Sequence, residues 1–152
     1  MCDRITWALV SGITLAAIAG CAPGPTSGKG FTLPKGNIEE GQAAFISLKC
    51  HACHSVAGIE LPEITAELNP RVQLGGEVPR INTYGELVTS IINPSHKLAQ
   101  GYPAEAVSRD GASRMTNYNH ALTVQQLIDL VAFLQSRYKL EPYVPTEYPP
   151  IY

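Results

Sequence analysis

One short stretch of the chain has the residue types and spacing to do chemistry, Cys50-His51-Ala52-Cys53-His54. Two cysteines at this spacing point the same way from one helical turn, so both thiols can form thioether bonds with the two vinyl groups of one haem. The histidine that directly follows is carried beneath the porphyrin, where it can ligate the iron. The C-x-x-C-H spacing therefore predicts one covalently attached haem c, held by Cys50, Cys53 and His54.

Two other kinds of site use the same cysteine spacing, a redox dithiol and half of a zinc site. A zinc site needs further Cys or His ligands at a matching spacing, but the other cysteines, Cys2 and Cys21, lie in an N-terminal segment that reads as an export signal. A redox dithiol more naturally follows a strand in a βαβ pattern, which the sequence lacks. The histidine directly after the second cysteine favours the haem interpretation.

The N-terminal segment has the features of a signal peptide. Arg4 supplies a positive charge, and residues 5–19 form an apolar run too short for a comfortable membrane span. The run ends in Ile18-Ala19-Gly20-Cys21, which resembles the lipobox of bacterial lipoproteins, whose cysteine is lipidated and begins the mature chain. The alternatives are an ordinary secretory cleavage site and an uncleaved anchor. We expect residues 1–20 to be removed and the lipid on Cys21 to hold the protein on the outer side of a bacterial membrane, periplasmic or at the cell surface.

Proline-rich segments flank the central part of the chain. Residues 22–35 are rich in Pro, Gly, Ser and Thr, so we expect residues 21–36 to be a lipidated flexible tether. Residues 141–152 alternate proline with tyrosine and cannot form a helix. This tail either docks on a partner protein or folds back on its own domain. The folded domain is expected between these segments, at residues 37–140, and its lack of any basic run argues against a nucleic-acid partner.

The helix expected before the haem motif begins with Asn37, which with Glu40 resembles a capping box. Gly41 inside it costs about 1 kcal/mol unless another part of the chain must come close there. The apolar residues that give this helix its buried face are Ile38, Ala44, Phe45 and Leu48.

Two further helices are predicted from complete capping boxes. Thr83 with Glu86 predicts a helix over residues 83–92, which Asn93-Pro94 ends. Thr123 with Gln126 predicts a helix near the end of the domain. Its expected apolar stripe consists of Val124, Leu127, Val131, Leu134 and Tyr138.

These elements in this order resemble the small class I, monohaem cytochromes c. Gly41-x-x-x-Phe45 followed by the C-x-x-C-H motif looks like the N-terminal helix and haem box of that family. The resemblance covers residues 37–139 and implies an all-α fold, with three or more helices wrapped around one covalently bound haem. It further implies that Gly41 and Phe45 meet Leu130 and Phe133 on the C-terminal helix, and that the middle helix closes the propionate side of the haem.

The same resemblance implies the ligands of the iron. Met115 stands where the family carries its thioether ligand, after a stretch at 95–114 whose length of about 20 residues is typical of a functional loop. The alternatives for the sixth ligand are His96 and His120. On the other side, a carbonyl near a loop proline, Pro70 or else Pro62, is expected to accept a hydrogen bond from His54. Candidates for binding the propionates are Arg71, Arg80, Tyr84 and Asn117.

The function implied is that of an electron carrier rather than an enzyme: a membrane-tethered monohaem cytochrome that moves single electrons between redox partner proteins. One alternative is a dedicated haem subunit of a larger membrane-associated respiratory or dehydrogenase complex. Another, of a different class, is a gas-sensing or catalytic haem protein with an open sixth site. The expected partners are redox proteins or complex subunits, together with the membrane reached through the lipid on Cys21.

Overall fold

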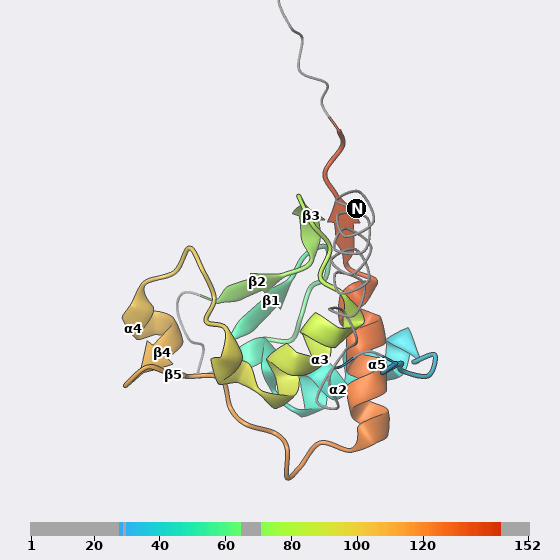
Figure 1. Cartoon of the computed structure of the whole chain (residues 1–152), viewed down its shortest axis with the longest axis horizontal. Helices are drawn as coiled ribbons and strands as arrows, with labels where there is room; N and C mark the ends of the chain where they lie inside the picture. The colour runs from blue at the N-terminus through green and yellow to red at the C-terminus, as the bar shows by residue number, and fades with distance from the viewer. Residues whose placement is uncertain (1–27, 29, 65–70, 144–152) are drawn as a thin grey trace, which may run out of the picture. The chain divides into compact units, whose positions relative to one another are not determined.

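The computed structural model describes residues 28, 30–64 and 71–143 of the chain (Figure 1). The chain divides into two units, residues 1–32 and residues 33–152. In the first unit, the backbone N–H of Phe31 donates to the carbonyl of Gly28 at 3.1 Å. None of the helices in the described residues has the length and apolar character to cross a membrane. The predicted signal peptide, Cys21 and most of the proline-tyrosine tail lie outside the described residues.

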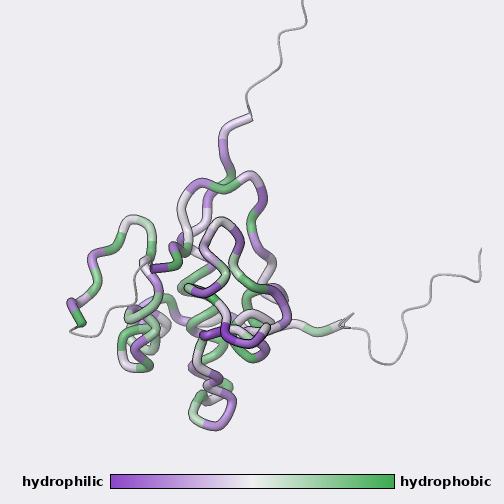
Figure 2. The backbone as a smooth tube through the Cα atoms, turned by 90° about the vertical axis from the view of Figure 1, so that its left-hand side faces the viewer, coloured by the Kyte–Doolittle hydropathy of each residue, from purple (hydrophilic) through white to green (hydrophobic). Residues whose placement is uncertain are grey.

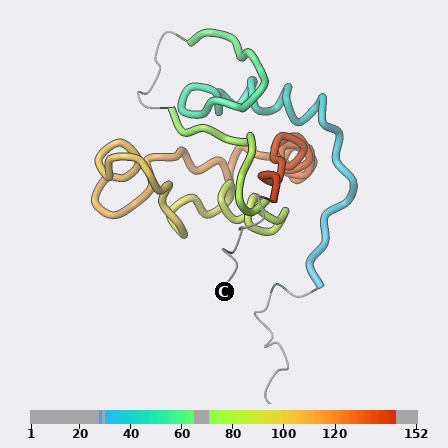
Figure 3. The backbone as a smooth tube through the Cα atoms, turned by 90° about the horizontal axis from the view of Figure 1, so that it is seen from above, coloured from blue at the N-terminus to red at the C-terminus, as the bar shows by residue number. Residues whose placement is uncertain are grey.

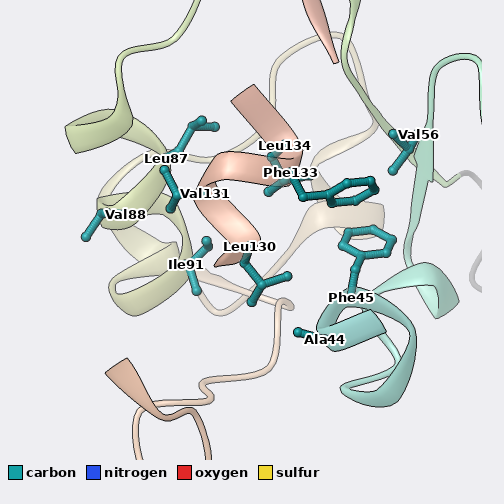
Figure 4. Close-up of a cluster of buried hydrophobic side chains, with 10 residues drawn as sticks. All are labelled: Ala44, Phe45, Val56, Leu87, Val88, Ile91, Leu130, Val131, Phe133 and Leu134. Atoms are coloured by element: carbon teal, nitrogen blue, oxygen red, sulfur yellow. The ribbon is translucent and has the colours of Figure 1, made fainter. Parts of the chain in front are cut away.

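A pair of helices, α2 (Ile38–Ser47) and α5 (Val124–Gln135), forms the centre of the second unit. They come close together at Gly41, where an added Cβ would overlap the carbonyl oxygen of Asp129 and lie 2.6 Å from the Cβ of Phe133. Farther along α2, the rings of Phe45 and Phe133 lie 5.7 Å apart between centroids and face each other in the core (Figure 4). The predicted contact between Gly41, Phe45 and the last helix is therefore confirmed.

Helix α3 (Tyr84–Ile92) packs beside α5. Its capping box is complete, since Thr83 and Glu86 bond each other's backbone N–H, and the same exchange joins Thr123 and Gln126 at the start of α5. Both predicted helix starts are confirmed. The buried residues of α3 are Leu87, Val88 and Ile91, of which Leu87 and Ile91 lie on the side toward α5 in Figure 4.

The buried face of α5 agrees in part with the predicted stripe, since Val131 and Leu134 are buried and Leu127 and Tyr138 are partly buried against the core. Val124 is 74 % exposed at the first turn, and Tyr138 lies beyond the helix in a strand. The close contact at Gly41 places Asp129 and Phe133 against α2, so these two residues are buried as well. The buried residues of α5 are Ile128, Asp129, Leu130, Val131, Phe133 and Leu134. In Figure 2, hydrophobic and hydrophilic residues are interleaved along the backbone, as expected for helices that bury one face.

Helices build the core, but the prediction of an all-α fold omits short strands. Strands β1 and β2 are parallel with His54 opposite Val72, and β3 and β6 are parallel with Gly76 opposite Tyr138. Strands of three residues are too short for an alternating pattern to reveal them. In the described residues the strands are β1 (His54–Val56), β2 (Val72–Leu74), β3 (Gly76–Val78), β4 (Ser108–Arg109), β5 (Ala112–Ser113) and β6 (Tyr138–Leu140).

The stretch at 95–114, expected to be a loop, contains regular structure. It begins within the 3-10 turn η3 (Pro94–His96) and includes the helical turn α4 (Ala104–Val107) and the antiparallel hairpin of β4 and β5. Asp110 and Gly111 join the hairpin strands with φ angles of 51° and 77°. An Asp-Gly pair is typical of such a turn, and is the signal that could have predicted the hairpin. In Figures 1 and 3 this segment lies on the side of the domain away from α5.

Candidate functional site

The C-x-x-C-H motif follows directly on the end of α2. Lys49 has a φ of 56°, a left-handed conformation that ends the helix and turns the chain. One 3-10 turn, η2 (Cys50–Ala52), then brings the cysteines to its two ends, with the N–H of Cys53 donating to the carbonyl of Cys50 at 3.1 Å. Both thiols are partly buried and free of disulfide bonds. The turn predicted from the spacing is therefore observed, with one cysteine at each of its ends.

The electrostatics of the thiols differ from those of a reactive dithiol. Burial raises the pKa of the Cys50 thiol to about 11. Burial also raises the pKa of Cys53, against an opposing effect of the Arg114 guanidinium. A catalytic dithiol needs a lowered pKa to provide thiolate. Among the described residues no three His, Cys, Asp or Glu side chains are gathered as a metal ion would require. Neither alternative for the cysteine pair therefore gains support.

His54 is held by the pairing of β1 with β2. Its Nδ1 lies 3.2 Å from the carbonyl oxygen of Val72, and the N–H of Val72 donates to the carbonyl of Cys53 at 2.8 Å. A carbonyl only accepts, so Nδ1 carries the proton and Nε2 keeps its lone pair for a metal. Burial lowers the pKa of His54, against the opposing effect of this hydrogen bond, and so favours the neutral ring that a ligand requires. The acceptor lies in the stretch that begins at Pro70, although Pro70 itself is outside the described residues.

Two cavities, of 340 Å³ and 90 Å³, share His54, Ser90 and Met115 in their walls. Cys53 lines the larger cavity and Cys50 the smaller. The larger one has the size of a typical small-molecule or cofactor site, about 300–1,000 Å³. The walls of the smaller cavity are mainly apolar, with side chains from Phe45, Leu48, Leu74, Leu87, Ile91, Leu122, Leu130 and Leu134. The structure thus brings Met115, which is distant in sequence, together with Cys50, Cys53 and His54.

Met115 is partly buried just after the β4–β5 hairpin, where its N–H donates to the Oγ of Ser113 at 3.1 Å. The two histidines considered as alternatives, His96 and His120, are exposed and line neither cavity. The Nδ1 of His96 instead bonds the carbonyl of Asn93 at 2.8 Å. This arrangement favours Met115 over the two histidines as the second iron ligand beside His54. The assignment stays a prediction.

The polar residues on the cavity walls are not those expected from the sequence. The four propionate candidates line neither cavity, and Arg80 forms a surface ion pair with Glu86 at 2.7 Å. The polar residues that do line the larger cavity were not predicted, because they come from loops or helix faces whose position depends on the whole fold. The polar residues that line the larger cavity are Asn82, Ser90, Lys97, Gln100, Ser113 and Arg114.

Tyr118 is a second residue that the sequence analysis missed. It lines the smaller cavity together with Met115, and its hydroxyl donates to the carbonyl of Leu48 at 2.7 Å. His51, between the two cysteines, is 4 % exposed, lines neither cavity, and its Nδ1 has no hydrogen-bond partner in the described part of the chain. His51 therefore points away from the site, whereas Tyr118 belongs to it.

Comparison with known proteins identifies one family. The family model described as Cytochrome c matches residues 38–137, from the first residue of α2 to just beyond the end of α5. The match includes the C-x-x-C-H motif, the β1–β2 pair and Met115. No curated protein and no solved structure matches the chain.

Proposed function

Because the chain belongs to the cytochrome c family, a family of c-type haem electron carriers, we propose that it is a membrane-tethered monohaem cytochrome that passes single electrons between redox partner proteins. Members of the family bind haem c covalently, and the spacing of Cys50, Cys53 and His54 is consistent with that attachment. The observation that carries the proposal is that both thiols, His54 and Met115 line two cavities with shared walls.

The residues present fit a covalently bound haem. Two neutral thiols at the ends of one turn suit thioether formation, and His54 presents Nε2 while Val72 fixes its other ring nitrogen. The thioether of Met115 is the proposed sixth ligand. When bound, haem supplies a one-electron Fe(III)/Fe(II) couple, whose potential His–Met ligation raises.

The chain's own part in electron transfer is to hold its ligands still and to exclude water. The hydrogen bond from His54 to Val72 fixes the tautomer and the ring orientation. The apolar walls around the smaller cavity disfavour additional charge there, which favours the reduced state of a bound redox centre. If the ligands keep their positions when the iron is oxidised, the reorganisation energy is small. A small reorganisation energy allows fast electron transfer.

Anchoring rests on the sequence pattern that ends at Cys21. We propose that residues 1–20 are a lipoprotein signal peptide, that Cys21 is lipidated, and that residues 21–36 tether the domain to the outer side of a bacterial membrane. Two or more acyl chains, at about 0.8 kcal/mol for each buried CH₂, make a stable anchor.

A fixed place in a membrane-associated oxidoreductase complex is the second candidate, favoured by the start of the proline-tyrosine tail. Leu140 and Tyr143 are 61 % and 87 % exposed, so large apolar side chains face solvent where the tail begins. Such side chains suit a protein interface. Deletion of residues 142–152 is expected to leave the visible spectrum unchanged and to weaken recovery of partner subunits from native membranes. Unchanged recovery together with a large loss of thermal stability would instead support a tail that folds back on its own domain.

The function itself is tested by a redox titration of the protein purified from a host with working cytochrome c maturation. We expect a reversible transition that involves one electron, and a ferrous spectrum that carbon monoxide leaves unchanged. A ferrous form that binds carbon monoxide readily would favour the open-site haem protein, and absence of haem would reject the proposal.

A further inference from the structure

We propose that Tyr118 and Asn119 are positioning residues for Met115, and that they fasten the segment carrying it to the ends of two helices. The inference rests on the proposed role of Met115 as an iron ligand. Met115 is followed by no helix until α5 begins at Val124, so the intervening residues have few backbone bonds to hold them in place. Their position must therefore come from contacts with other elements.

Tyr118 supplies the first of these contacts. Its hydroxyl donates to the carbonyl of Leu48 at 2.7 Å, a partly buried bond that joins residues 70 positions apart. Leu48 is the C-cap of α2, and the left-handed turn at Lys49 ends the helix there, so its carbonyl has no partner within the helix. The bond thus satisfies a helix-end carbonyl that lies two residues before Cys50.

Asn119 supplies the second contact at the end of another helix. Its Nδ2 donates to the carbonyl of Ile92, the last residue of α3, at 2.9 Å. The carbonyl of Tyr118 also accepts from the N–H groups of Ala121 and Leu122, each at 2.8 Å, which makes a tight turn toward α5. Adjacent side chains therefore tie one turn to the carboxyl ends of α2 and α3.

This geometry places the anchor close to Met115. Tyr118, Leu48, Met115 and His54 all line the same small cavity. A thioether is a weak iron ligand and stays bound only if its segment is held within reach. Loss of either tie is expected to increase the fraction of molecules in which Met115 is away from the iron, and this fraction sets how well an external ligand competes.

The test uses the full-length, haem-loaded protein in the ferric state, with imidazole as the competing ligand. Tyr118→Phe keeps the ring on the cavity wall and removes only the hydroxyl with its hydrogen bonds. Because one hydrogen bond changes a folded equilibrium by a modest amount, imidazole is expected to bind about 3- to 10-fold more tightly. The near-infrared band of sulfur–iron(III) ligation should weaken, while the haemochrome spectrum stays unchanged.

Tyr102→Phe is the matched control. The Tyr102 hydroxyl accepts from the N–H of Gln73 at 3.1 Å, but Tyr102 lines neither cavity. We expect its imidazole affinity to stay within about twofold of the parent, because this bond holds neither Met115 nor the turn at Tyr118. An equal increase in both variants would overturn the proposal, since it would indicate general loosening of the domain.

Two further outcomes separate the possible failures. A parent protein without the sulfur–iron band would reject Met115 as ligand and this inference with it. A parent with the band, and a Tyr118→Phe variant with only a lower melting temperature, would reject the inference alone. If Tyr118→Phe does not accumulate, Asn119→Ala must raise imidazole affinity in the same direction, and an unchanged affinity would contradict the anchor.

Discussion

The backbone N–H of Asn37 donates a hydrogen bond to the Oδ1 of Asp129 at 2.8 Å, and so joins the start of α2 to α5 across 92 positions of sequence. The Nε2 of Gln125 donates to both carboxylate oxygens, at 3.0 and 3.1 Å. Asp129 is only 5 % exposed. Its negative charge lies at the N-terminus of α2, where the helix dipole favours an anion. Asn37 caps the same helix by accepting from the N–H groups of Glu39 and Glu40, so two residues share the cap.

Replacement of Asp129 should destabilise the domain without affecting haem attachment. Asp129→Ala leaves the Asn37 N–H without its acceptor in a partly buried place, and we expect a loss of about 1–3 kcal/mol in the free energy of unfolding. Asp129→Asn keeps one acceptor oxygen and should lose less. Urea unfolding of the haem-loaded variants measures both. Equal stability of Asp129→Ala and the parent would show that the contact between the helices does not depend on this carboxylate.

Gly41→Ala should weaken the pairing of α2 with α5. The new Cβ would overlap the backbone of Asp129, which cannot move without shifting the whole helix, so we expect a loss of about 1–3 kcal/mol or more. Gly85→Ala is the matched control in α3, because its Cβ would be 3.9 Å from the nearest atom, the Oγ1 of Thr83. That variant should be neutral or more stable by about 0.4–1 kcal/mol. The measurement is thermal unfolding of both variants beside the parent. An equal change in the melting temperatures of the two variants would contradict the packing account.

Met115→Ala should abolish the near-infrared sulfur–iron band and lower the reduction potential, because water then reaches the iron in place of the thioether. His96→Gln and His120→Gln are the controls, since both histidines are exposed away from the cavities. Near-infrared absorption and a redox titration of the three variants measure the effect. Persistence of the band in Met115→Ala would exclude this residue, and loss of native ligation in a histidine variant would identify the true ligand.

Cys21→Ser should prevent lipidation and release the protein from the membrane, or leave an unprocessed precursor. The measurement is fractionation of cells into soluble and membrane parts, with the mass of the protein determined in each. The haem spectrum of the variant serves as the control, since the domain is expected to bind haem as the parent does. A variant that stays with the membrane and loses its signal peptide as the parent does would contradict the predicted lipobox.

Local signals explain which parts of the fold were predictable. The capping boxes at Thr83 and Thr123 lie within four residues of sequence, and both helices begin where these pairs indicate. Asn37 was recognised as a cap, but its N–H bonds Asp129 rather than Glu40, and no local pattern could indicate a partner 92 positions away. The burial of Asp129 has the same origin, because it follows from the contact between α2 and α5 at Gly41.

The candidate site divides in the same way. The residues with distinctive chemistry, Cys50, Cys53, His54 and Met115, were predicted and line the same pair of cavities. Val72 as the acceptor for His54 depends on the pairing of two strands of three residues each, too short to recognise in sequence. Tyr118 was missed because a tyrosine in a loop carries no signal until its acceptor is known.

The central claim, covalent attachment of one haem through Cys50 and Cys53, is tested most directly by the intact mass of the denatured protein. The protein made in a host with cytochrome c maturation should carry the mass of one haem, and its absorbance should stay with the polypeptide after acid and organic extraction. The Cys50→Ala and Cys53→Ala variants should each give a haemochrome spectrum shifted to that of a single thioether, with poor yield. A parent protein that denatures to the mass of the bare polypeptide, with its haem extracted or never bound, would contradict the account.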